Sequence, residues 1–110
     1  MITFEQRERA FEAKYAYDEE FRFRVTARRD KLFAHWAAEQ LHLRDPNELT
    51  SWILAVEDGP GHDARLLDLV RHIFLARGVK DLAGLTTALG QCDEKARLEL
   101  LDHHPSPLNA

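Results

Sequence analysis

The chain has 110 residues, which is enough for one domain with a single hydrophobic core and too few for two. Hydrophobic residues make up 45% and charged residues 31%, a composition typical of a soluble helical protein. The net charge of −4 excludes the basic footprint of a general nucleic-acid-binding protein. The single cysteine, Cys92, excludes an internal disulfide and a cysteine-based zinc site.

Residues 3–18 predict a helix that is stable only in context. Thr3 and Gln6 fit a capping box, in which each side chain bonds to the other's backbone N–H. The segment contains no Gly or Pro, but it is mostly charged and its apolar stripe is thin: Phe4, Phe11 and Tyr15. Isolated helices of this length are marginal in water, so we expect the segment to be mobile in the free protein.

Residues 19–43 predict a stable helix that faces the core. Asp18 is a suitable cap at which a new segment could start, and apolar residues follow at steps of four or seven. Residues 22–31 carry five basic residues and one acid. This basic cluster could bind phosphate or an acidic partner, but we favour a solvated face beside the acids of residues 45–68.

Two further helices are marked by their ends. Asp45 and Pro46 predict the start of the second helix, and the turn Asp58–Gly61 predicts its end. Asp63 is expected to cap the third helix, and Gly78 to end it in the left-handed conformation. The predicted core combines both tryptophans with apolar residues of these helices: Trp36, Trp52, Ile53, Val70, Ile73 and Phe74.

Asp81 predicts the start of the last helical region. Gly84 and Gly90 weaken it, and Gly90 is a candidate break. We therefore expect an all-α fold, a small four-helix bundle with a mobile N-terminal helical segment. The chain, 1–110, is predicted to be a single domain: a mobile segment (1–18), a helix bundle (19–102) and a flexible tail (103–110).

Catalytic and metal-binding patterns are not evident. The six histidines lack a metal-ligand spacing, and Cys92 lies beside acids that would raise its pKa rather than activate it. We expect neither an enzyme nor a metalloprotein. The N-terminus has no apolar run of signal-peptide length, and no stretch approaches the roughly 20 apolar residues of a membrane span. The protein is therefore expected in the cytoplasm.

The first forty residues resemble a known family. The runs that carry the resemblance are Arg7-Glu8-Arg9-Ala10-Phe11-Glu12-Ala13-Lys14, Asp18-Glu19-Glu20, Phe21-Arg22-Phe23-Arg24, Ala27-Arg28-Arg29, Lys31-Leu32 and Trp36-Ala37-Ala38-Glu39. In this order they resemble the alphaproteobacterial ATPase inhibitor family, the zeta subunit of F-type ATP synthase. The resemblance is dense over about residues 4–43 and weaker beyond. Tyr17 stands where the family usually has His.

This resemblance implies a function. It implies an inhibitor of ATP hydrolysis whose N-terminal helix inserts at the catalytic subunit interface of the ATP synthase head and blocks rotation. The residues assigned to that contact are Arg7, Glu8, Arg9, Phe11, Glu12, Lys14 and Tyr15. The free protein would be a monomer that reaches the inner face of the membrane only through ATP synthase. No cofactor is expected. The family implies possible ATP or ADP binding, but no Gly-rich loop locates a site.

Two alternatives remain open at this stage. The chain could be a helical interaction module for another cytoplasmic partner, or a nucleotide-sensing module without catalysis. In either case it would be a divergent paralogue that has lost inhibition.

Overall fold

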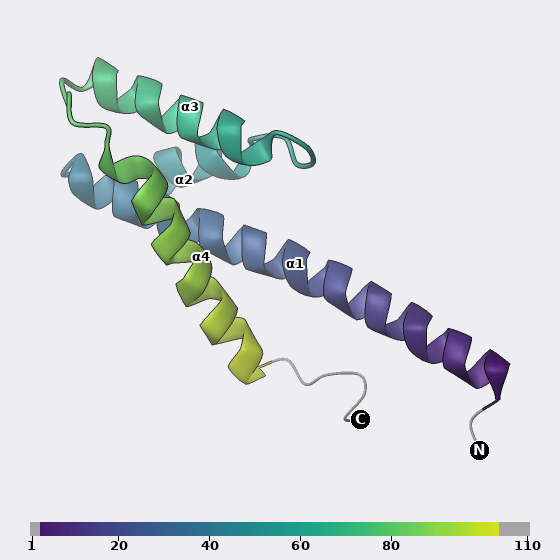
Figure 1. The fold of residues 1–110 in the computed structure, drawn as a ribbon. Coiled ribbons are helices and arrows are strands. Elements are labelled where there is room, and N and C mark those ends of the chain that lie inside the picture. The colour runs from purple at the N-terminus through teal and green to yellow at the C-terminus, as the bar shows by residue number, and fades with distance from the viewer. Residues whose placement is uncertain (1–2, 104–110) are drawn as a thin grey trace.

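The fold consists of four helices in a computed structural model that describes residues 3–103 (Figure 1). The helices are α1 (Phe4–Gln40), α2 (Asn47–Leu54), α3 (His62–Ala76) and α4 (Gly84–His103), and the described residues contain no strand. The all-α, four-helix prediction is confirmed. Residues 104–110 of the predicted tail lie outside the described residues, and α4 includes His103.

Helix α1 is continuous, so the predicted new start at Asp18 is wrong. The segment has no Gly or Pro that would break the helix, and ion pairs stabilise the helical turns directly after Asp18. Arg22 pairs with Glu19 at 3.2 Å and Arg24 with Glu20 at 2.6 Å, the three- and four-residue spacings that stabilise a helix. The 37 residues of α1 therefore form one rod about 55 Å long.

The two ends of α1 are closed by backbone and side-chain hydrogen bonds. The predicted capping box is present: Gln6 N donates to Thr3 Oγ1 at 3.2 Å, and Thr3 N donates to Gln6 Oε1 at 3.1 Å. At the C-terminus His42 adopts φ 55°, and Leu43 N donates to Ala38 O at 3.0 Å. This is a Schellman ending with a histidine in the left-handed position that glycine usually occupies.

The same ending closes α3, and here the prediction is confirmed. Gly78 has φ 82°, and Val79 N donates to Phe74 O at 2.9 Å. Asp45 Oδ1 accepts from Asn47 N at 3.0 Å, as a helix cap would, although α2 begins one residue later than predicted. The expectation for Asp63 is wrong: left-handed Gly61 precedes α3, and Asp63 pairs with Arg29 of α1 instead.

Helix α4 starts at Gly84 and runs through Gly90, so the candidate break at Gly90 is not a break. A glycine inside a helix costs roughly 1 kcal/mol relative to alanine. Packing outweighs this cost, because one face of α4 is buried: Leu85, Ala88, Leu89 and Ala96. Leu85, Ala88 and Leu89 are thus part of the core.

The core lies where the C-terminal half of α1 meets the other three helices. Its buried members are Phe33, Ala34, Ala37 and Ala38 from α1, Leu49 and Ile53 from α2, Leu66, Val70 and Phe74 from α3, and Leu85, Ala88 and Leu89 from α4. Trp36 is half-buried and stacks between Phe33 and Phe74, with ring centroids 5.6 and 6.0 Å apart. Ile73 is also partly buried and packs against this cluster.

The prediction for Trp52 is wrong, because its side chain is 48% exposed. Only eight residues form α2, and its buried positions are Leu49 and Ile53, four residues apart. Trp52 shares the apolar half of the helix but lies beside this pair rather than on it. The core therefore draws its large aromatic rings from α1 and α3.

Candidate functional site: the uncovered half of the long helix

The N-terminal half of α1 projects beyond the bundle (Figure 1). The first buried residue along this helix is Val25, and every side chain from 3 to 16 is exposed. Burial therefore begins gradually between Tyr17, which is partly exposed, and Val25. All seven predicted contact residues lie in this half: Arg7, Glu8, Arg9, Phe11, Glu12, Lys14 and Tyr15.

Part of the predicted set shares one face of the helix. Phe4, Phe11 and Tyr15 follow at steps of seven and four, and their side chains are 73%, 68% and 70% exposed. Glu8 lies in the same row by its spacing. We call Phe4, Phe11 and Tyr15 the aromatic row. Three large rings uncovered on one helical face are more than a solvated surface requires.

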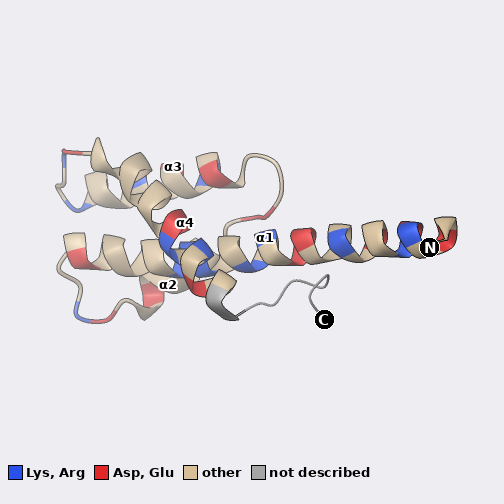
Figure 2. Cartoon of the chain, turned by 60° about the horizontal axis from the view of Figure 1, so that its bottom comes forward, with Lys and Arg blue, Asp and Glu red and all other residues tan. Residues whose placement is uncertain are grey.

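The remaining charges surround the aromatic row rather than joining it. By helical geometry, Arg7 and Lys14 flank it on one side, Glu12 flanks it on the other, and Arg9 lies on the far side of the helix. Positive and negative residues alternate along this part of α1 (Figure 2). Among the described residues, none of the seven side chains makes an ion pair or a hydrogen bond, so their charges are available to a partner.

The aromatic row continues the core face of the same helix. Continuing from Tyr15 at steps of seven and four gives Arg22, Arg29 and Phe33, and the last two are buried. Because α1 is unbroken, one face is covered by the bundle at its C-terminal end and uncovered at its N-terminal end. The sequence pattern predicted the rings but not this alignment.

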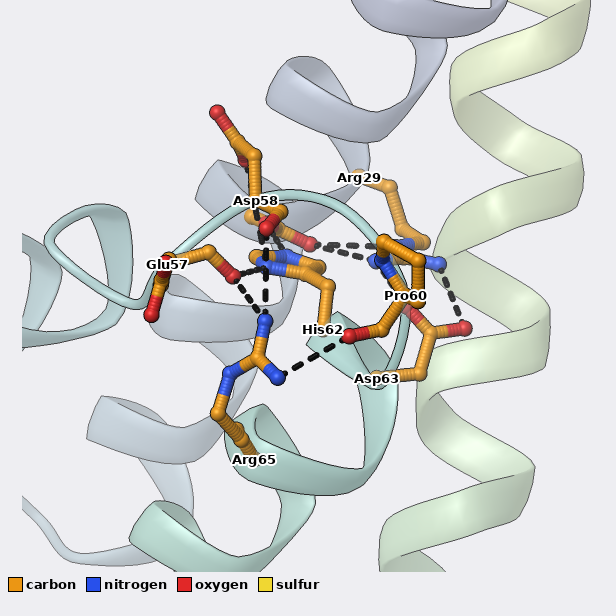
Figure 3. A network of polar contacts seen from close by, with 8 residues as sticks. Arg29, Glu57, Asp58, Pro60, His62, Asp63 and Arg65 are labelled. Carbon is orange, nitrogen blue, oxygen red and sulfur yellow. Dashed lines mark hydrogen bonds and ion pairs between the residues drawn. The ribbon is translucent and has the colours of Figure 1, made fainter.

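A polar network with a buried centre, Arg29, Asp30 and His62, holds α1 to the start of α3 at the edge of the bundle (Figure 3). Arg29 Nη2 and Nη1 donate to Asp63 Oδ1 at 2.8 Å and Oδ2 at 3.2 Å, and Arg29 Nε donates to Asp30 Oδ1 at 3.0 Å. Burial lowers the pKa of Arg29, but the contacts with Asp63 and Asp30 raise it above its ordinary value. The guanidinium therefore keeps its charge inside the protein.

His62 completes the network. One ring nitrogen, Nε2, lies 2.7 Å from Asp30 Oδ2, and the other, Nδ1, lies 2.9 Å from the carbonyl oxygen of Glu57. Both neighbours are acceptors, so only the doubly protonated ring satisfies both contacts. Burial lowers the pKa of His62, but the bonds to Glu57 and Asp30 outweigh burial and the nearby Arg29, and the pKa is raised above its usual range.

The loop between α2 and α3 is fixed by a second arginine. Arg65 Nη2 donates to the carbonyl oxygen of Glu57 at 2.7 Å, and Arg65 Nη1 donates to that of Pro60 at 3.0 Å (Figure 3). These bonds hold the loop over the middle of α1. The network and the loop together keep the root of the projecting helix in place.

Sequence reasoning found the aromatic row but missed the network. It placed Arg29 in a solvated basic cluster beside the acids of residues 45–68. Arg29 does pair with one of these acids, Asp63, but its side chain is buried rather than solvated. Arg29 falls four residues after Val25 and four before Phe33, inside the core stripe. A charge at that position signals a buried partner.

No catalytic arrangement emerges from the described residues. Burial raises the pKa of the Cys92 thiol, opposed by Lys95 and Arg29, so the expected direction is confirmed but burial, not the acids beside it, is the cause. A thiol with a raised pKa is a weak nucleophile at neutral pH. No three metal-ligating side chains gather among the described residues.

Comparison with protein families identifies the chain. The sequence model of the family described as ATPase inhibitor subunit zeta matches residues 1–99. The chain belongs to this family. No curated protein and no solved structure matches it. Membership in the zeta family indicates a regulatory role toward an ATPase rather than a catalytic one.

The zeta-family match covers both the projecting helix and nearly all of the bundle. It therefore extends the resemblance, which was dense only over about residues 4–43, to almost the whole chain. Among the described residues, no helix has the length and apolar character needed to cross a lipid bilayer.

Proposed function

We propose that this protein inhibits ATP hydrolysis by F-type ATP synthase by inserting the N-terminal half of α1 at a catalytic subunit interface of the enzyme head. The observation that carries the proposal is the uncovered aromatic row, placed on a rod that a folded bundle holds at one end. In a chain of the zeta inhibitor family, such a projecting helix is narrow enough to enter a crevice, while the bundle that carries it would stay outside.

The physical chemistry of the segment suits a crevice. Burying Phe11 and Tyr15 in pockets would supply the apolar contact that a binding helix needs, and Arg7, Lys14 and Glu12 would pair with charges on the walls. Ordering a mobile segment costs free energy, which these contacts offset. A helix wedged at an interface that must open and close during hydrolysis would block rotation.

Removal of the segment tests this mechanism. Deleting residues 1–17 should leave the bundle folded, because the buried core starts at Val25, and should abolish inhibition of ATP hydrolysis. Phe11→Ala with Tyr15→Ala should weaken binding by roughly 4 kcal/mol, about three orders of magnitude, if each ring contributes about 2 kcal/mol and the effects add.

A matched control is available on the bundle. Leu75 and Leu98 are 51% and 65% exposed and lie on α3 and α4, so Leu75→Ala with Leu98→Ala removes two exposed apolar side chains that do not belong to α1. This variant should inhibit like the wild type.

Inhibition by the truncated protein at unchanged concentration would show that the N-terminal half of α1 is not the effector. A pulldown that recovers another protein and no ATP synthase would favour an interaction module.

A further inference from the structure

A fourth exposed ring lies outside the aromatic row, at the boundary between the projecting half of α1 and the bundle. Phe23 is 65% exposed. It follows Tyr15 by eight residues, about 12 Å along the helix and roughly a quarter turn away from the aromatic row. A crevice that receives the aromatic row would therefore not receive Phe23 by the same contact. This ring needs a separate explanation.

Phe23 borders a hollow of about 240 Å³ between α1 and the C-terminal part of α4. Three apolar side chains and three cations line it: Phe23, Ala27, Leu100, Arg24, Arg28 and Lys31. We call these six residues the Phe23 patch. Its composition, an exposed aromatic ring beside several cations, is typical of the centre of a protein interface.

The charges of the Phe23 patch favour an acidic occupant. The three cations follow at steps of four and three, so they lie on one side of α1. Arg24 pairs with Glu20 at 2.6 Å, and Arg28 Nε pairs with Glu99 at 2.7 Å, but such half-exposed pairs are worth about 0–1 kcal/mol and can exchange with other carboxylates. Lys31 has no carboxylate partner among the described residues.

We propose that the Phe23 patch is a second docking site, which takes an acidic segment with one apolar side chain from the outer surface of the same ATP synthase head. The inference rests on the proposed function, because the partner is the one that the aromatic row enters. The hollow would receive the apolar side chain, and the cations would pair with the carboxylates beside it. The aromatic row would then block rotation, while the Phe23 patch would add affinity.

Two variants and two matched controls test the proposal in the full-length protein. Phe23→Ala removes the ring, and Lys31→Glu reverses the charge that has no carboxylate partner among the described residues. Leu98→Ala removes a side chain with the same exposed fraction on α4, and Lys80→Glu reverses an exposed charge after α3. The Kd for the purified catalytic head would be measured at low and high salt, and residual ATP hydrolysis at saturation.

We expect Phe23→Ala to raise Kd about tenfold at both salt concentrations, as loss of an interface ring does. Lys31→Glu should raise it about tenfold at low salt and by clearly less at high salt, because salt screens exposed charges. Both variants should reach the wild-type level of inhibition at saturation, since the aromatic row is intact. Both controls should bind like the wild type.

Each alternative outcome has a distinct meaning. If the wild type binds the head and both Phe23→Ala and Lys31→Glu bind it with the same Kd, the second site is overturned and the proposed function is left intact. Absence of wild-type binding to the head overturns the proposed function, and the second site falls with it. Sedimentation with anionic phospholipid vesicles that depends on Phe23 and Lys31, with no change in affinity for the head, assigns the Phe23 patch to a membrane surface and also overturns the proposal.

Discussion

At the scale of single residues, His62 links the stability of the bundle to pH. Its ring faces Asp30 from α1 and the Glu57 carbonyl from the loop, with Arg29 nearby and Asp58 Oδ1 at 3.9 Å. The pKa of His62 is raised in the folded state, so its charged form adds stability below the unfolded pKa of about 6.5. That stability is lost as pH rises through the higher folded pKa.

The free energy of unfolding of the wild type should therefore fall as pH rises above about 6.5, and that of His62→Asn should fall much less. Urea denaturation at several pH values between 6 and 8.5 measures both. His35 is exposed and its side chain makes no hydrogen bond or ion pair among the described residues, so His35→Asn should follow the wild type. Parallel curves for the wild type and His62→Asn would contradict the argument.

His42 is a second residue whose replacement should change the free energy of unfolding in a predictable direction. Its left-handed conformation, φ 55°, costs a residue with a side chain about 1–2 kcal/mol, and glycine avoids this cost. Glycine also gives the unfolded chain more freedom, which offsets part of the gain. We expect His42→Gly to raise the free energy of unfolding by about 0.5–1 kcal/mol, measured in urea. Gln40→Gly, inside the last turn of α1, should lower it by a similar amount.

At the scale of elements, α1 is one helix with two environments. Its C-terminal half is buried under three helices, whereas every residue of its N-terminal half from 4 to 16 is exposed. Local opening should be frequent where packing is absent. We expect amide hydrogens of residues 7–16 to exchange much faster than those of residues 29–40, as measured by NMR. Equal protection of both halves would contradict the predicted mobility.

Local signals in the sequence predicted much of the fold. The capping box at Thr3 and the left-handed Gly78 depend on neighbours in the chain, and both are confirmed. Gly90 was misjudged because the packing of α4 against α1, which keeps the helix intact, is a tertiary effect. Trp52 was misjudged because helical spacing alone does not tell the middle of an apolar face from its edge.

The candidate site divides in the same way. The aromatic row could be found because its rings stand in a charged stretch with little else apolar. The network could not, because His62 reaches Asp30 only through the turn that places the start of α3 beside α1. Thirty-two residues separate these two partners in the chain, and no periodicity connects them.

At the scale of the whole molecule, the shape is unusually long. It measures 64 × 26 × 23 Å, and the Cα radius of gyration is 17.9 Å, against roughly 13 Å for a compact protein of this size. Small-angle X-ray scattering should therefore give a value well above 13 Å for the full-length protein. Deleting residues 1–17 should bring it close to the compact value. A compact result for the full-length protein would mean that the N-terminal segment folds back onto the bundle.

The unbroken helix also sets a depth. In the proposed complex the bundle would stay outside the crevice, and the fully exposed part of α1, residues 4–16, would reach about 20 Å into it. Seven extra residues after Asp18 would advance the aromatic row by about 10 Å while turning it by only about 20°. One extra residue would turn it by about 100° with almost no advance. The distance that the helix reaches and the direction in which its rings point can thus be changed separately. Each change would alter in its own way how the rings fit their pockets.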